Sequence, residues 1–406
     1  MGVIPSKVVL QKVESVPPLS AAVAKLCELI QKPDVDGNEI VDVISKDVAL
    51  TGKLLGMANS AYYGHSQEVG TAREALLIMG LTDIRNKALS TSVLEMKIGD
   101  PTKGGPLTQM ELWRHSIAAA TIATEVARLL RCDEPEEAFV GGLLHDVGRL
   151  IFIGFFSETY STVLQKAATD AKPIQVLEQE AFGISGPDVA RALGRRWQIP
   201  TELMNMVSRY ANPLTAQSLG TNEGRLVASV RVGDHLARLM GVGSDGNPYL
   251  ELDFLHVVHR DWLSSEDLQQ LLVDSPEQIR MLEMSLGLAA TESERPQPAT
   301  SSNIAGVLIE NSQVRSVVEL ALRALGCRLA PVNEASVAQL AFGLVVVDEQ
   351  ASPAIAETLA QRNIVTLNVS AWCREQAGGD PPSRLSASHL REWLSPKPAA
   401  APAAAN

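Results

Sequence analysis

The chain has 406 residues, 46% hydrophobic and 20% charged, with a formal net charge of −12, which suits a folded protein of two or three domains. The negative balance argues against nucleic-acid binding, which depends on Lys and Arg neutralising phosphates. No stretch reaches the roughly 18 apolar residues of a membrane span and the N-terminal stretch has no signal-peptide core, so we expect a cytoplasmic protein.

Apolar residues at helical spacing predict an all-helical domain over residues 1–290. Asp36 and Asp47 are placed to cap two of its helices, while Thr71 should begin a further helix that Gly80 ends. The predicted helices cover about residues 19–31, 36–44, 47–57, 71–80, 82–96, 109–130, 134–146, 156–171, 174–182, 187–197, 201–207, 223–240 and 265–286. We divide this domain into N-terminal helices (13–96), a core (107–243) and a helical extension (244–290).

The helical pattern stops at residues 291–303, which are polar, contain two prolines and predict a linker. Short apolar runs at 304–309, 344–347 and 364–367 then predict buried strands, with an amphipathic helix at 313–325. Strand and helix in alternation favour a parallel sheet, so residues 304–395 are predicted to form a small α/β domain. The Ala/Pro-rich stretch 396–406 is predicted to be a disordered tail.

Four residues of the core are candidates for one metal site: His115, His145, Asp146 and Asp234. His145 and Asp146 are adjacent, yet both can face one point because their helix is ending just before Gly148. Two imidazoles and two carboxylates suit one divalent transition metal. Such a metal makes hydroxide available at neutral pH, and hydrolysis of a phosphate ester would follow.

A purely structural interpretation competes with this one. A His at a helix C-terminus interacts favourably with the helix dipole, and an Asp there can bond to backbone donors. Trp113 and Trp197 are expected to pack in the core rather than stack on a ligand. The run from Asn59 to Gly64 could present a partner surface or simply cap and turn a helix, and the latter is favoured. Four widely spaced cysteines, Cys27, Cys132, Cys327 and Cys373, predict neither a zinc knuckle nor disulfides.

These residues resemble the HD superfamily of metal-dependent phosphohydrolases, and more closely the HD-related output domain (HDOD) of bacterial signalling proteins. The resemblance covers roughly residues 13–243 and rests on several stretches in the right order. They are Val16-Pro-Pro-Leu19, the run from Asp47 to Gly64, Ala75-Leu-Leu-Ile-Met-Gly80, Trp113-Arg-His-Ser116, Gly142-Leu-Leu-His-Asp-Val-Gly148, Trp197-Gln-Ile-Pro200 and the Asp234 segment. The family implies an all-helical HD-like fold and regulation by protein contact, without an established reaction.

The sequence also departs from that family's pattern. Asp47-Val48 stands where members often have Asp-Pro, and the additional histidines of the two-metal HD-GYP phosphodiesterases are not readable. Where many HDOD sequences have a His after a Phe-Gly step, this chain has Phe182-Gly-Ile-Ser-Gly186, and Tyr210-Ala211 stands where they often have a paired His. The four candidate ligands remain, but the auxiliary ligands are missing.

The C-terminal region resembles a response-regulator receiver domain, a flavodoxin-like fold, over residues 306–393. Glu310 looks like one acid of its magnesium site and Asp348 like its phosphoacceptor. Asn311 replaces the second acid, Asn368 the hydroxyl residue, and no Lys stands near Pro381. Fewer carboxylates weaken a magnesium site, so we predict a degenerate module that is not phosphorylated.

Three hypotheses follow for the whole chain. The first is a bacterial regulatory protein that binds signalling proteins, and itself, through a non-catalytic HDOD domain. The second is a single-metal phosphohydrolase acting on a nucleotide or cyclic dinucleotide at His115, His145, Asp146 and Asp234. The third is a domain that binds such a nucleotide without cleaving it.

Overall fold

The protein is represented by a computed structural model. It describes residues 3–288 with gaps at 30–33, 61–62, 65–66, 100–104, 170–171, 213, 216, 248, 252–253 and 255–261. Beyond residue 288 it describes 304–308, 317–322, 328–330, 344–347, 355, 365–368, 384–386 and 390. The predicted linker and tail, Glu310 and Asp348 therefore lie outside the described residues.

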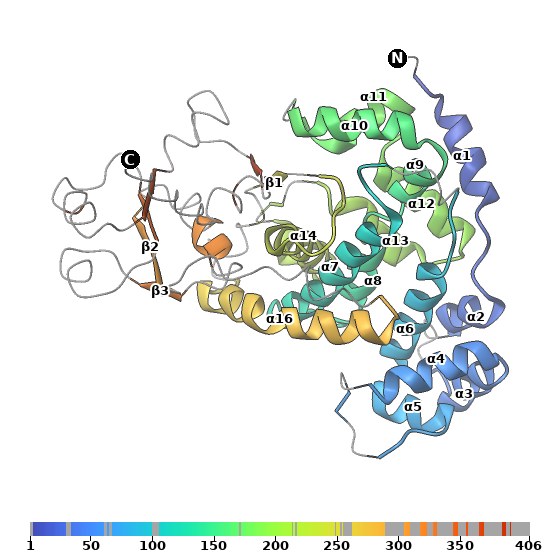
Figure 1. Ribbon diagram of the computed structural model, residues 1–406. Coiled ribbons are helices and arrows are strands. Elements are labelled where there is room, and N and C mark those ends of the chain that lie inside the picture. The colour runs from blue at the N-terminus through green and yellow to red at the C-terminus, as the bar shows by residue number, and fades with distance from the viewer. Residues whose placement is uncertain are drawn as a thin grey trace, which may run out of the picture.

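The described part of residues 3–288 is mainly helical (Figure 1). Its helices are α1 (Ser6–Ser15), α2 (Ala21–Leu29), α3 (Gly37–Ser45), α4 (Val48–Ala58), α5 (Ala72–Met79), α6 (Leu81–Leu94), α7 (Gln109–Leu129), α8 (Glu137–Leu144), α9 (Arg149–Phe155), α10 (Ser157–Thr169), α11 (Ile174–Phe182), α12 (Gly186–Arg196), α13 (Thr201–Arg209), the short 3₁₀ helix η1 (Ser218–Gly220), α14 (Asn222–Met240) and α16 (Ser265–Ser285). The prediction of a mainly helical fold is confirmed.

Local sequence signals account for many of these boundaries. Asp36 and Asp47 cap α3 and α4 as predicted, each accepting a hydrogen bond from a backbone N–H of its helix. Thr71 begins α5 with a capping box and Gly80 ends it. The Asn59 side chain is structural, because it bonds the backbone of Val69 through both its oxygen and its nitrogen.

The centre of the fold is formed by α7, α8 and α14, which pack against one another. Two glycines allow the backbones to approach closely. A Cβ atom on Gly142 of α8 would lie 2.5 Å from the Cα atom of Ala120 on α7, and one on Gly233 of α14 would lie 2.5 Å from the carbonyl oxygen of Ala119. Both glycines lie near candidate metal ligands, so the close contact brings those ligands together.

Three elements differ from the prediction. Helix α1 begins at Ser6, ahead of the predicted N-terminal helices, and packs on α9 and α12 of the core. The chain turns at 145–148 and forms a separate helix, α9. The predicted helical extension, residues 244–290, is not wholly helical. It contains the strand β1 (Tyr249–Glu251), whose backbone hydrogen bonds are made to another strand.

Four of the described strands beyond residue 288 form a parallel sheet in the order β3-β2-β4-β5. These strands are β2 (Ile304–Leu308), β3 (Arg328–Ala330), β4 (Leu344–Val347) and β5 (Val365–Asn368). A sixth strand, β6 (Arg384–Ser386), leaves this sheet and pairs antiparallel with β1, beside α14. The C-terminal region is therefore joined to the helical core by backbone pairing as well as by the chain.

The most apolar helical segment is part of the buried core of the protein. Among the described residues, only Glu137–Phe155 is long and apolar enough for a membrane span by length and composition, and 83% of its most apolar window is buried inside the protein. Cys27 and Cys132 are free and buried, as expected of small core residues. Trp113 and Trp197 are also core residues, at 2% and 1% exposure.

Candidate metal centre

The fold brings the four predicted ligands together. His115 comes from α7, His145 and Asp146 follow the end of α8, and Asp234 lies on α14. Each offers one ligand atom, and these atoms all lie within 4.8 Å of one another. All four side chains are at most 1% exposed. We call these four residues the His-Asp cluster.

The two imidazoles present nitrogen atoms to the carboxylates. His115 Nε2 lies 3.0 Å from Asp234 Oδ1, and His145 Nε2 lies 3.1 Å from Asp146 Oδ2 and 3.5 Å from Asp234 Oδ1. His145 Nδ1 lies 2.6 Å from the carbonyl oxygen of Gly142. A proton on Nδ1 that bonds this carbonyl leaves the Nε2 lone pair facing the carboxylates, which is the usual arrangement of a metal-binding histidine.

Two arginines balance the carboxylates of the cluster. Arg149 Nη1 donates to Asp146 Oδ2, and Arg238 Nη2 lies 2.7 Å from Asp234 Oδ2. Both guanidinium groups also bond Asp245, at 2.7 and 2.8 Å from its Oδ2 atom. These two arginines and Asp245 form a buried network around the cluster.

Tyr210 and Glu178 complete the surroundings. The Tyr210 hydroxyl donates to Asp146 Oδ1 at 2.6 Å, and its ring lies edge-on to His145 with centroids 4.9 Å apart. Glu178 Oε1 accepts from Arg149 Nε at 3.3 Å and from the Tyr160 hydroxyl at 3.0 Å. Tyr210 therefore bonds a candidate ligand without being one.

The pKa shifts reflect this crowding of charge. Burial alone would lower the pKa of His145, but Asp146 and Asp234 outweigh it and raise that pKa to about 10. Burial would raise the pKa of Asp234, but Arg238 and the two cluster histidines hold it well below its usual value. Asp234 thus faces groups that favour its charged form, and a bound cation would act in the same sense.

The residues present fit a divalent metal. Within the described structure His145 Nε2 is a buried nitrogen without a hydrogen-bond partner, although it points into the cluster. Four buried carboxylates, those of Asp146, Asp234, Asp245 and Glu178, face two guanidinium groups, so negative charge is in excess when both histidines are neutral. Buried charge of this kind requires compensation, which a metal ion or histidine protonation can supply.

The four candidate ligands could be predicted from the sequence, whereas the groups around them could not all be. Arg149 follows Asp146 by three residues and Arg238 follows Asp234 by four, and this helical spacing could have revealed both pairs. Asp245 lies in a loop 96 positions from Arg149, and no local pattern connects them. His235 bonds the backbone of Arg231 and packs against Phe254, so it points away from the cluster as predicted.

Part of the helical region is similar to known proteins. The HDOD domain model matches residues 16–213. An uncharacterized protein of Treponema pallidum (strain Nichols) is 25% identical over 203 residues, which are 50% of this chain and 38% of the relative, so the match spans well under half of that protein.

Two solved structures are similar to the helical fold. A protein of Marinobacter aquaeolei VT8, provisionally assigned to signal transduction, has a TM-score of 0.53 and 18% identity over 68% of this chain and 60% of its own. An HDOD domain protein of unknown function from Geobacter sulfurreducens has a TM-score of 0.49 and 23% identity, covering 71% of this chain and 92% of its own. At 18% identity, the similarity to the Marinobacter protein shows a shared fold and nothing about function.

Proposed function

Because the HDOD domain model matches residues 16–213, we propose that this chain is a bacterial regulatory protein that acts through contacts with other proteins and with itself. The observation that carries this proposal is the closure of the His-Asp cluster. All four side chains are buried, and the Asp146 oxygens are both engaged, by Tyr210 and Arg149. A catalytic metal needs an open coordination position and access for its substrate, whereas a structural site is closed.

The neighbourhood of β1 supports a regulatory role for the C-terminal region. Glu251, the last residue of β1, lies opposite Arg384 in the β1–β6 pairing. Its carboxylate lies 3.1 Å from His235 Nε2, and its backbone nitrogen lies 3.0 Å from the same atom. His235 is adjacent in α14 to the cluster residue Asp234. A change in the pairing of β6 with β1 would therefore move Glu251 and, through His235, could affect Asp234 of the cluster.

We further propose that the C-terminal region is a receiver-like module that is not phosphorylated. The strand order β3-β2-β4-β5 matches the first four strands of the flavodoxin-like order 2-1-3-4-5, which supports this assignment. Treatment with a small phosphodonor should leave Asp348 unlabelled by intact-mass spectrometry. Labelling that disappears in Asp348→Asn would contradict the proposal of a degenerate module.

The second candidate is a single-metal phosphohydrolase acting on a nucleotide or cyclic dinucleotide. The mixed nitrogen and oxygen donor set of the His-Asp cluster favours it. His115, His145, Asp146 and Asp234 would hold the divalent ion, which would supply a nucleophilic hydroxide when bound. The helical shell would have to open before a phosphate ester could reach these buried side chains.

One set of measurements separates the two candidates. The full-length protein is incubated with cyclic dinucleotides and nucleotides in the presence of Mg²⁺, Mn²⁺ or Zn²⁺, beside the variant Asp146→Asn. We expect no turnover above that of the variant. Wild-type turnover that the variant lacks would overturn the non-catalytic proposal.

The contact proposal itself is tested by isolating the full-length chain from its native host under mild conditions. We expect a self-associated species or a protein partner in constant stoichiometry, measured by light scattering and mass spectrometry. A monomer that retains no partner would refute it. Elemental analysis of the same material, beside His145→Ala, reports whether the His-Asp cluster holds a metal.

A further inference from the structure

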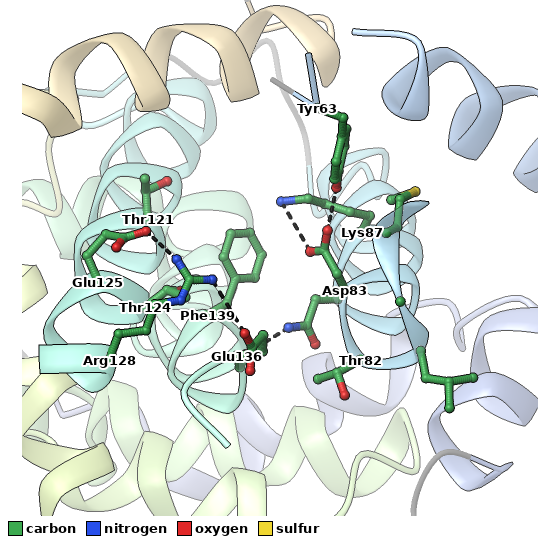
Figure 2. A pocket seen from close by; sticks show the side chains of 14 residues that line it. Tyr63, Thr82, Asp83, Lys87, Thr121, Thr124, Glu125, Arg128, Glu136 and Phe139 are labelled. Carbon is green, nitrogen blue, oxygen red and sulfur yellow. Dashed lines mark hydrogen bonds and ion pairs between the residues drawn. The ribbon is translucent and has the colours of Figure 1, made fainter. Parts of the chain in front are cut away.

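A second polar site lies apart from the His-Asp cluster, in a cavity of about 380 Å³ between α6 and the helices α7 and α8 (Figure 2). We call it the α6–α7 cavity. Its lining residues Glu136 and Phe139 lie just before α8 and in its first turn, whereas His145 follows the end of that helix. One wall belongs to the N-terminal helices and the other to the core. Small-molecule sites are frequent at such junctions, and this volume is within their usual range.

Three hydroxyl groups of the cavity, those of Thr121, Thr124 and Tyr63, already donate their protons within the protein and can only accept hydrogen bonds from a ligand. Thr121 Oγ1 donates its proton to the carbonyl of Ile117 at 2.9 Å, and Thr124 Oγ1 donates to the carbonyl of Ala120 at 2.8 Å. Both threonines are more than nine-tenths buried. Each hydroxyl has one proton, which is already donated, so only the lone pairs of its oxygen are available to a ligand in the cavity. The Tyr63 hydroxyl likewise donates to Asp83.

The charged groups of the lining also leave a surplus of acceptors. Three carboxylates, from Asp83, Glu125 and Glu136, accompany two cations, Lys87 and Arg128. Figure 2 shows Asp83 and Lys87 on α6 facing Glu125 and Arg128 of α7 across the cavity. Lys87 is paired with Asp83, and Arg128 with both glutamates. One negative charge is therefore in excess, and a phosphate-bearing ligand would face both that charge and the acceptor oxygens.

The aromatic ring of Phe139, which also lines the cavity, favours a cation as well. Phe139 is 5% exposed, and the ammonium nitrogen of Lys87 lies 4.4 Å from its ring centroid. The ring thus already contacts one organic cation, through the attraction of its π-electrons for positive charge.

We propose that the α6–α7 cavity binds a small organic cation bearing ammonium or guanidinium groups. Its N–H groups bond the Thr121 and Thr124 oxygens and the carboxylate of Glu125, and its charge balances the negative excess of the lining. Because the two walls come from the N-terminal helices and the core, the bound cation ties these two parts together. This inference is independent of the proposed function and concerns a different site.

The direct test is isothermal titration calorimetry of the full-length protein with putrescine and agmatine, beside AMP and inorganic phosphate. We expect saturable one-site binding of at least one amine and none of either anion. Binding of an anion without either amine would overturn the proposal, as would the absence of binding by every compound at millimolar concentration. A lysine-rich peptide that binds more tightly than both amines would overturn the assignment to a free small molecule.

Matched variants locate the binding site. Glu125→Gln and Thr124→Val should each weaken amine binding about tenfold or more, because each removes an acceptor for a charged donor. Thr124→Ser keeps the hydroxyl and should retain the affinity. Glu158→Gln makes the same charge change on an exposed part of α10 and should leave the affinity unchanged. Wild-type affinity in both Glu125→Gln and Thr124→Val, with unchanged melting temperatures, would show that the amine binds elsewhere.

Discussion

Replacing Arg149 by Met should destabilise the protein strongly. The Arg149 side chain is 0% exposed, and its guanidinium contacts carboxylates of Asp146, Asp245 and Glu178. Met fills a similar length of the space but carries no charge. The substitution therefore leaves buried carboxylates facing one another with only Arg238 as a nearby buried guanidinium.

The magnitude follows from the cost of uncompensated buried charge. Breaking a buried ion pair by removing one partner costs about 3–5 kcal/mol of the free energy of unfolding. A change of 1 kcal/mol shifts the melting temperature of a domain of this size by about 2–4 °C, so the midpoint should fall by roughly 10 °C.

The matched control is Arg191→Met on α12. Arg191 also forms an ion pair, with Asp188 at 2.8 Å, but the two side chains are 46% and 45% exposed. Exposed pairs contribute about 0–1 kcal/mol because water and salt screen them. Urea unfolding followed by circular dichroism measures both variants, together with metal content before unfolding.

The reasoning is refuted if the two variants lose the same small amount of stability. That result would mean that water or histidine protonation compensates the carboxylates without Arg149. A loss of several kcal/mol in Arg149→Met alone, with an unchanged slope against urea, is the expected result.

Three further variants test separate features of the core. Tyr210→Phe removes a hydrogen bond to a buried carboxylate and should cost about 1.5–3 kcal/mol in urea unfolding; no loss would mean that this bond contributes nothing. Gly142→Ala should cost about 1–3 kcal/mol by forcing two helices apart, whereas Gly56→Ala, whose Cβ meets nothing within 4 Å, should be neutral or stabilising. Burial would raise the pKa of Glu251, but its hydrogen bond with His235 lowers it, so this stabilisation is present above pH 4.5 and lost as pH falls below it. Glu251→Gln should therefore lose stability at pH 7 and show a weaker acid dependence than the wild type; parallel pH profiles would contradict this.

The sequence predicted the helices best where local signals end them. The helix at Ile174–Phe182 was predicted at both ends, because Pro173 precedes it and Gly183, in the left-handed conformation, follows it. Helix α1 was missed because its two buried residues, Val9 and Val13, leave only a narrow apolar stripe. The strand β1 could not be predicted locally, since its pairing partner is more than 130 positions away.

The candidate site likewise contains residues that local sequence signals predict and residues that they do not. Ligand residues such as His145 and Asp146 could be predicted because their types and positions at helix ends are unusual. Their balancing groups could not all be predicted, because Asp245 and Tyr210 reach Arg149 and Asp146 only through tertiary structure. The same limit applies to the α6–α7 cavity, whose polarity depends on where the Thr121 and Thr124 protons point.

The retention of a His-Asp cluster is not by itself an argument for catalysis. The cluster lies near two close backbone approaches, of α8 and of α14 to α7, and its carboxylates are bonded to Arg149, Arg238 and Tyr210. Loss of any one member would leave the others buried without compensation, which destabilises the fold whether or not a reaction takes place. Selection for stability is therefore sufficient to keep these residues, and a reaction would require, in addition, a route from solvent to the cluster. Tyr210→Phe separates the two roles, because it loosens the cluster without removing a ligand: in a structural centre it lowers stability and metal retention together.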